Sequence, residues 1–115
     1  MNFFKFVSET LSGGISFNPT FGTVPERGFM VSLPNQEQKI KLNTFCINDV
    51  RLYFLDNLEF FESKDYFLGS WLHEDNVYLD ISINVETLDI ALNIAKQNNQ
   101  LVIYDVSNRA CIMVE

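Results

Sequence analysis

The sequence has few of the residues that build metal sites and disulfide frameworks. Among its 115 residues there are two cysteines, Cys46 and Cys111, and one histidine, His73. Two cysteines without a CxxC pair and a single histidine are too few for the usual zinc site, and two cysteines are too few for a disulfide framework. We therefore expect no metal, no cofactor, two buried free cysteines, and the reducing cytoplasm of a cell as the setting.

Long apolar segments and catalytic motifs are also missing. No apolar run reaches the roughly 18 residues that a membrane-spanning helix needs. Lys5 and Glu9 break up the apolar start of the chain, so we do not expect it to be a signal peptide. His73 lies in a predicted turn, and Gly13-Gly14 precedes a predicted strand, so it is no phosphate-binding loop. These absences favour a non-enzymatic protein that folds as one domain over residues 1–115.

Negative charge is what the sequence has in excess, and it is concentrated in the central third. The chain carries 15 acidic and 8 basic residues, for a net charge of −7. Residues 49–89 hold ten acidic residues and two basic ones, whereas residues 1–48 have a net charge of +1 and residues 90–115 a net charge of zero. A field of this sign repels phosphates and attracts basic surfaces. We therefore expect a basic protein as partner and no direct binding of nucleic acid.

Hydrophobic periodicity and turn residues predict an α+β domain. The first eleven residues fit a helix or a strand, and both alternatives stay open. We expect a wide hairpin between the first two strands, a tight hairpin over 66–85, and one parallel pairing between the strands 77–85 and 101–106. The result is a mainly antiparallel sheet with two helices on one face, in the order β-β-β-α-β-β-α-β-β. The predicted helices span 48–62 and 86–98, and the predicted strands span 15–17, 29–33, 38–42, 66–72, 77–85, 101–106 and 110–114.

The predicted helix at 48–62 has an acidic face that we interpret as a partner-binding surface. Asn48 is its expected N-cap, and its apolar face consists of Val50, Phe54, Leu58 and Phe61. Four acidic residues lie on the other side, spaced by seven, three and three residues: Asp49, Asp56, Glu59 and Glu62. Neither Asp56 nor Glu59 has a basic residue at i+4 that would offset its charge. A solvated helix face is the alternative. Together with an exposed Phe60 and the 73–80 hairpin, the candidate partner-binding residues are Asp49, Asp56, Glu59, Phe60, Glu62, Glu74, Asp75 and Asp80.

Two other hypotheses stay open. The second hypothesis is a small enzyme that uses Asp80 or Asp105, each of which lies in an apolar strand near a tyrosine. The two residues would form an acid/base pair if their carboxyl groups came within about 5–9 Å of each other. Hydrogen bonding of these carboxylates to a turn is the alternative. The third hypothesis is an accessory or structural protein that self-associates through an exposed strand edge.

Several segments resemble a family of small uncharacterised proteins carried by phages, plasmids and integrative elements. The resemblance consists of a GxW…VYLDxS…AKxxNQLxIYD pattern, found here in Gly69-Ser70-Trp71, in 77–82 and in 95–106, and it extends upstream to Gly13-Gly14 and 28–33. It implies no catalytic residue, but it implies a protein acting inside a bacterial cell. In that context small acidic proteins often inhibit host defence, as anti-CRISPR and anti-restriction proteins do. We therefore expect a non-enzymatic inhibitor whose acidic surface blocks the basic groove of a host nucleic-acid-binding protein, such as a CRISPR or restriction nuclease.

Overall fold

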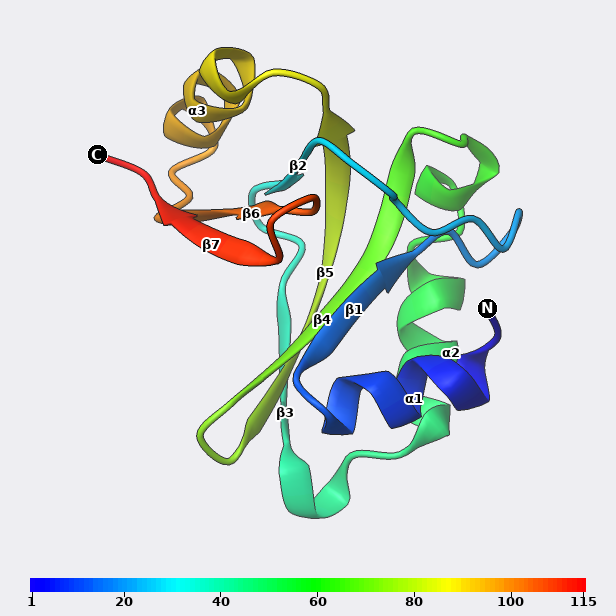
Figure 1. Ribbon diagram of the computed structural model, residues 1–115. Coiled ribbons are helices and arrows are strands. Elements are labelled where there is room, and N and C mark those ends of the chain that lie inside the picture. Colours follow the sequence, from blue (N-terminus) through cyan, green and yellow to red (C-terminus); the bar gives the residue numbers. More distant parts are fainter.

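The computed structural model describes residues 1–115 as three α-helices and seven strands that form one curled sheet (Figure 1). This confirms the predicted α+β class with a mainly antiparallel sheet. Two short 3₁₀ turns, η1 and η2, flank the second helix. The elements are α1 Phe3–Leu11, β1 Gly14–Phe17, β2 Phe29–Ser32, β3 Gln38–Lys41, η1 Leu42–Thr44, α2 Ile47–Asp56, η2 Phe60–Glu62, β4 Tyr66–His73, β5 Asn76–Val85, α3 Leu88–Gln97, β6 Val102–Asp105 and β7 Ala110–Met113.

The strand order is β1-β4-β5-β2-β6-β7, with β3 pairing β5 beyond the end of β2. The tight β4–β5 hairpin is confirmed, and it turns at Glu74, which has a φ of 56°. The predicted wide hairpin of β1 and β2 is wrong, because β1 pairs with β4 while β2 lies between β5 and β6. The predicted parallel pairing of β5 and β6 is also wrong, because β2 separates them and pairs with both in the antiparallel sense.

All three helices pack on the same face of the sheet. The register places the odd-numbered residues of β5 on this face, together with Leu68 of β4 and Val31 of β2. Helices α1 and α2 cover one half of the face, and α3 covers the other half (Figure 1). The first core consists of Phe6, Phe17, Val50, Tyr53, Phe61, Leu68, Val77, Leu79 and Ile81, and the second of Val31, Ala91, Ala95 and Ile103.

The N-terminal segment that the sequence left open is the helix α1. The Asn2 side chain caps it by accepting a hydrogen bond of 2.9 Å from the Lys5 N–H. Phe6 and Thr10, four residues apart, are both fully buried, and the hydroxyls of Thr10 and Ser70 lie 2.5 Å apart, which ties the helix to β4. Burial at helical spacing therefore decides between the two alternatives.

The helix α2 is shorter than the predicted 48–62 helix. It starts after Cys46 rather than Asn48, and the Asp49 carboxylate accepts a hydrogen bond of 2.8 Å from the Cys46 N–H. It ends at Asp56, because the Asn57 side chain donates to the Tyr53 carbonyl oxygen at 2.9 Å and the backbone of Asn57 leaves the helical conformation. The apolar periodicity beyond this point comes from a separate 3₁₀ turn, η2.

Candidate functional site

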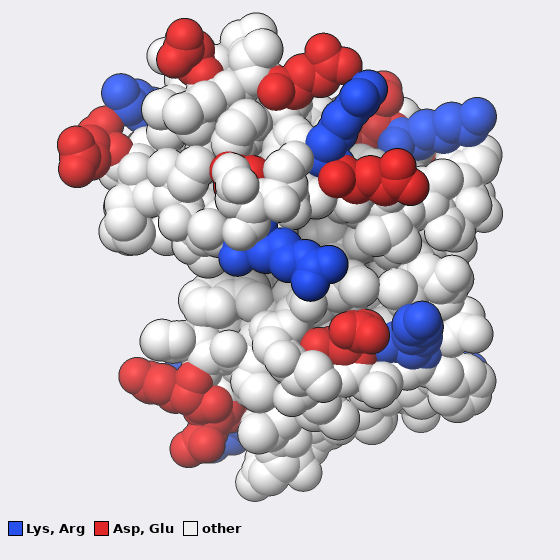
Figure 2. Space-filling view, in the orientation of Figure 1, with Lys and Arg blue, Asp and Glu red and all other residues white.

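The acidic residues predicted to form one surface are divided between two places. Asp56, Glu59 and Glu62 are exposed at the end of α2 and in the turn that follows it, whereas Glu74 and Asp75 form the exposed turn of the β4–β5 hairpin. Figure 1 shows this hairpin turn well apart from α2. In the view of Figure 2, acidic groups lie in separate clusters with Lys and Arg between them. The helix and the hairpin therefore do not share a single contact face, and the predicted joint surface has to be corrected.

The exposed carboxylates are nevertheless not neutralised by ion pairs. The only basic side chain near a carboxylate is His73, whose Nε2 lies 3.7 Å from Glu74, and no Lys or Arg lies within 4.0 Å of any carboxylate. The charges of Asp56, Glu59 and Glu62 thus face solvent without a fixed counter-charge. They remain available to a positively charged partner.

Three leucines beside these carboxylates are exposed, a feature that sequence reasoning missed. The exposed fractions of Leu52, Leu55 and Leu58 are 59%, 61% and 43%. Leu58 was expected on the buried face, but α2 ends before it, so the helical spacing no longer applies. The exposure of Leu52 and Leu55 could have been predicted from the sequence, because they are three residues apart and lie outside the buried stripe that contains Val50. We call Leu52, Leu55, Leu58, Asp56, Glu59 and Glu62 the α2 surface.

The neighbouring helix α1 extends this apolar area. Its Phe4 side chain is 70% exposed, and the guanidinium of Arg51 in α2 lies 5.9 Å from the centre of the Phe4 ring. The two helices are also joined underneath, because the rings of Phe3 and Phe54 are 5.6 Å apart. Exposed apolar side chains on two adjoining helices are typical of a surface that binds another protein.

Asp49 and Phe60, two of the predicted contact residues, have structural roles instead. Asp49 is half-buried and holds the first turn of α2 through the Cys46 N–H. Phe60 is half-buried rather than exposed, with its ring 5.5 Å from that of Tyr66. The end of α2 at Asp56 explains this, because η2 lets Phe60 pack inward next to the fully buried Phe61.

Asp80 is half-buried in the middle of β5, on the sheet face that carries no helix. Its carboxylate accepts a hydrogen bond of 2.6 Å from the Ser32 hydroxyl. Gly69 lies opposite it in β4, where any Cβ atom would collide with the Asp80 carboxylate. Burial raises the pKa of Asp80, the Ser32 bond lowers it and the charge of Glu37 raises it, with a net upward direction. The carboxylate is thus engaged inside the sheet by Ser32, and we leave Asp80 out of the surface formed by the exposed acids.

The two strand carboxylates proposed as an acid/base pair lie on opposite faces of the sheet. Asp105 pairs with Phe29, which packs in the core under α3, whereas Asp80 points to the open face. The carboxylate of Asp105 accepts hydrogen bonds from the backbone and side-chain N–H groups of Asn108, at 3.2 Å and 2.7 Å. Asp105 thus stabilises the β6–β7 turn, and the two carboxyl groups do not share a pocket.

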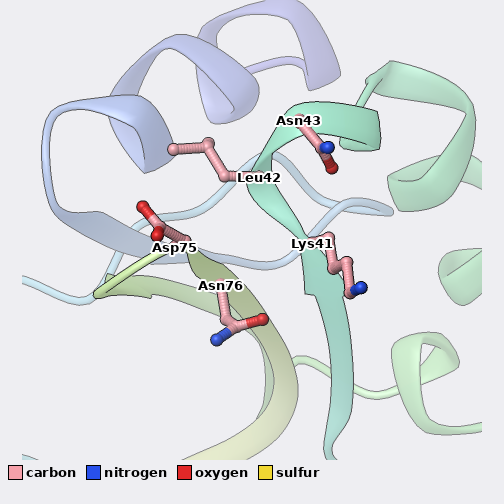
Figure 3. A pocket seen from close by; sticks show the side chains of 5 residues that line it. All are labelled: Lys41, Leu42, Asn43, Asp75 and Asn76. Atoms are coloured by element: carbon pink, nitrogen blue, oxygen red, sulfur yellow. The ribbon is translucent and has the colours of Figure 1, made fainter.

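A surface hollow with a volume of about 590 Å³ lies beside the β4–β5 turn. It is lined by Lys41, Leu42, Asn43, Asp75 and Asn76, and Figure 3 shows the side chains of Lys41 and Asp75 pointing away from each other. None of these five residues is a serine, cysteine or histidine that could act as an activated nucleophile or its base.

Neither the thiols nor the helices add a further site. Cys46 and Cys111 are both exposed, so the expectation of buried cysteines is wrong. No group of three or more His, Cys, Asp or Glu side chains is placed to hold a metal ion. None of the helices combines the length and apolar composition that crossing a bilayer requires.

Comparison of the chain with protein-family models, with curated proteins and with solved structures gives no match in any of the three. The geometry of the surface therefore has to carry the functional argument. The resemblance to mobile-element proteins stays a prediction.

Proposed function

We propose that this protein is a non-enzymatic binding protein that docks its α2 surface onto a basic groove of a nucleic-acid-binding protein and blocks that groove. The observation that carries this proposal is the combination, at the end of α2, of three exposed leucines with three carboxylates that have no cationic partner. Interfaces between proteins commonly have an apolar centre and a charged rim. The sign of the rim selects a basic partner and accelerates its approach.

The proposed partner follows from the charge and from the resemblance together. A chain with a net charge of −7 is repelled by nucleic acid and attracted by the basic groove that binds nucleic acid. The chain would compete for that groove because its carboxylates imitate the charge of the phosphates. The resemblance to mobile-element proteins makes a bacterial defence protein, such as a CRISPR or restriction nuclease, the proposed target, and the bacterial cytoplasm the proposed location.

The leucines refine the decoy mechanism that the sequence suggested. A purely electrostatic decoy loses its affinity as salt screens its charges over about 10 Å at 0.1 M. Leu52, Leu55 and Leu58 add an apolar contribution that salt does not screen. Binding should therefore weaken between low and moderate ionic strength and then level off.

The test compares charge reversal at the α2 surface with a matched reversal elsewhere. Immobilised wild-type chain is exposed to bacterial lysate at two salt concentrations, and retained proteins are identified by mass spectrometry. Asp56, Glu59 and Glu62 are reversed to Lys together in one variant. In the control, Glu26, Glu86 and Asp89, which are also exposed, are reversed to Lys and change the net charge equally.

We expect a nucleic-acid-binding protein to be retained by the wild type and the control but lost from the α2 variant. Adding the wild-type chain should also release DNA or RNA from that purified protein in a mobility-shift assay. Equal retention by the two variants would show that the α2 surface is not the contact. Retention without displacement of nucleic acid would refute the blocking mechanism.

A further inference from the structure

The outer edge of β7 is an unpaired strand edge. β7 stands last in the strand order, so one side of its backbone pairs with β6 and the other side is free. The Val114 N–H bonds to the Leu101 carbonyl oxygen at 2.9 Å, which shows that the even-numbered residues bond toward β6. The N–H and C=O groups of Cys111 and Met113 consequently point away from the sheet, where they can pair with another strand.

This edge lacks the protection that the other edges have. The edge strand β3 carries Lys39 and Lys41, and charged side chains on an edge discourage pairing. The strand β1 at the opposite end of the sheet packs against α1. The four residues of β7, Ala110–Met113, include no charge and no proline, and the Met113 side chain is 66% exposed.

The residues that flank β7 make this edge complementary to itself. Arg109 precedes the strand and Glu115 follows it. If two copies pair in the antiparallel sense about a twofold axis at Ile112, Glu115 of each copy comes next to the turn residue Arg109 of the other, which directly precedes the paired strand and has a φ of 51°. Cys111 then stands opposite Met113, so the outward-pointing backbone groups of both residues find partners. Moving the axis by one residue, to Cys111 or Met113, removes the charge pairing.

We propose that β7 is a self-association edge through which two copies of the protein join their sheets about a twofold axis at Ile112. A second copy is the occupant because a twofold interface uses the same patch on both subunits, and the charge order from Arg109 to Glu115 is its own complement. The strand is short, so the association is reversible and depends on concentration. Figure 1 places β7 and α2 on opposite sides of the protein, so the dimer would leave both α2 surfaces free.

Disulfide trapping tests the register. In a Cys46→Ser background the only native thiol is Cys111. The variant Met113→Cys adds a thiol that would face Cys111 of the second copy, at a Cα separation of about 5.5 Å for a hydrogen-bonded antiparallel pair. That separation is within the range that a disulfide spans. The matched control is Met113→Ser, in which the two Cys111 residues are diagonal neighbours at about 7–8 Å.

Mild oxidation should convert Met113→Cys to a covalent dimer at a rate that rises with protein concentration, while the control stays largely monomeric. Tandem mass spectrometry should show a bond from Cys111 to position 113 of the other chain. A dimer linked mainly from Cys111 to Cys111, or no faster dimer formation than in the control, would overturn the proposal.

Charge exchange provides an independent test without any cysteine chemistry. Sedimentation velocity over a concentration series should show a monomer–dimer equilibrium for the wild type. Arg109→Glu or Glu115→Arg alone should raise the dissociation constant roughly tenfold, because each change breaks two symmetry-related pairs. The double exchange should restore it, and Arg27→Glu, a reversal in an exposed loop, should leave it unchanged.

A wild type that stays monomeric at all concentrations would overturn the proposal, as would single reversals with no effect. No partner protein is used in either assay, so their failure would not touch the proposed function of α2.

Discussion

Asn18 is fully buried and makes four side-chain hydrogen bonds, so its replacement is a demanding test of the structure. Its amide Nδ2 donates to the carbonyl oxygens of Ser63 and Tyr66 at 2.8 Å and 2.9 Å. Its Oδ1 accepts from the N–H groups of Thr20 and Phe21 at 2.9 Å and 3.0 Å. Asn18 thereby ties the loop after β1 to the segment between η2 and β4, next to Glu62 of the α2 surface.

The expected loss of stability for Asn18→Ala follows from these bonds. Each contributes about 0.5–1.5 kcal/mol net, and a buried group left without a partner costs more. Thr20 and Phe21 lie in an exposed loop, where water replaces the lost acceptor, so their bonds count at the low end. The two carbonyl groups lose their donor in a partly buried place. We expect a decrease in the free energy of unfolding of about 3 kcal/mol.

Urea denaturation followed by circular dichroism and by the fluorescence of Trp71, the single tryptophan, measures this change. The variant Asn18→Asp serves as a second test, because its carboxylate keeps both acceptor contacts but has no hydrogen for the two carbonyl groups. Burial raises the pKa of this carboxyl in the folded state, so its stability should fall as the pH rises. A loss below about 1 kcal/mol for Asn18→Ala, or a pH-independent Asn18→Asp, would refute the reasoning.

Three further changes have defined outcomes. The folded-state pKa of Asp80 is raised above its ordinary value of 3.8. The free energy of unfolding of the wild type should therefore fall as the pH rises from 3.8 through the folded-state pKa. Urea unfolding at a series of pH values should show this fall for the wild type but not for Asp80→Asn. Gly69→Ala should cost about 1–3 kcal/mol because its Cβ would meet the Asp80 carboxylate, and the double variant with Asp80→Ala should lose less than the sum of the single losses. Leu55→Ala should change stability by less than about 0.5 kcal/mol, yet it should weaken retention of the partner in the lysate assay at moderate salt.

Elements defined by local patterns were predictable from the sequence. Alternation over residues 77–85 and the turn residues before it identified the β4–β5 hairpin, and apolar spacing identified α3 within a few residues of its ends. The end of α2 was not predictable in this way, because the apolar period continues through Leu58 and Phe61. The Asn57 side chain, which caps the Tyr53 carbonyl, stops the helix before that period does.

Pairing between distant strands was the part of the fold that local patterns could not supply. The β4–β5 hairpin offers a free edge on each side, and both β1 and β2 are short apolar strands that suit either edge. The loop between them is long enough to place them apart. The choice depends on which helix each strand must support, since β1 lies in the core under α1 and β2 in the core under α3.

The same distinction explains why the acidic surface was only partly predictable. The sequence concentrates its charge in residues 49–89, but those residues run through α2, β4 and β5 and into α3. Carboxylates of this one segment therefore become a helix cap at Asp49, a half-buried hydrogen-bonded group at Asp80 and an exposed cluster that begins at Asp56. What sets the last group apart from Asp49 and Asp80 is the set of three exposed leucines beside it, although exposed apolar side chains also flank the acids at the start of α3, at Leu88 and Ile90. The combination of these apolar side chains with unpaired carboxylates is the reason why we propose the end of α2 as the partner-binding surface.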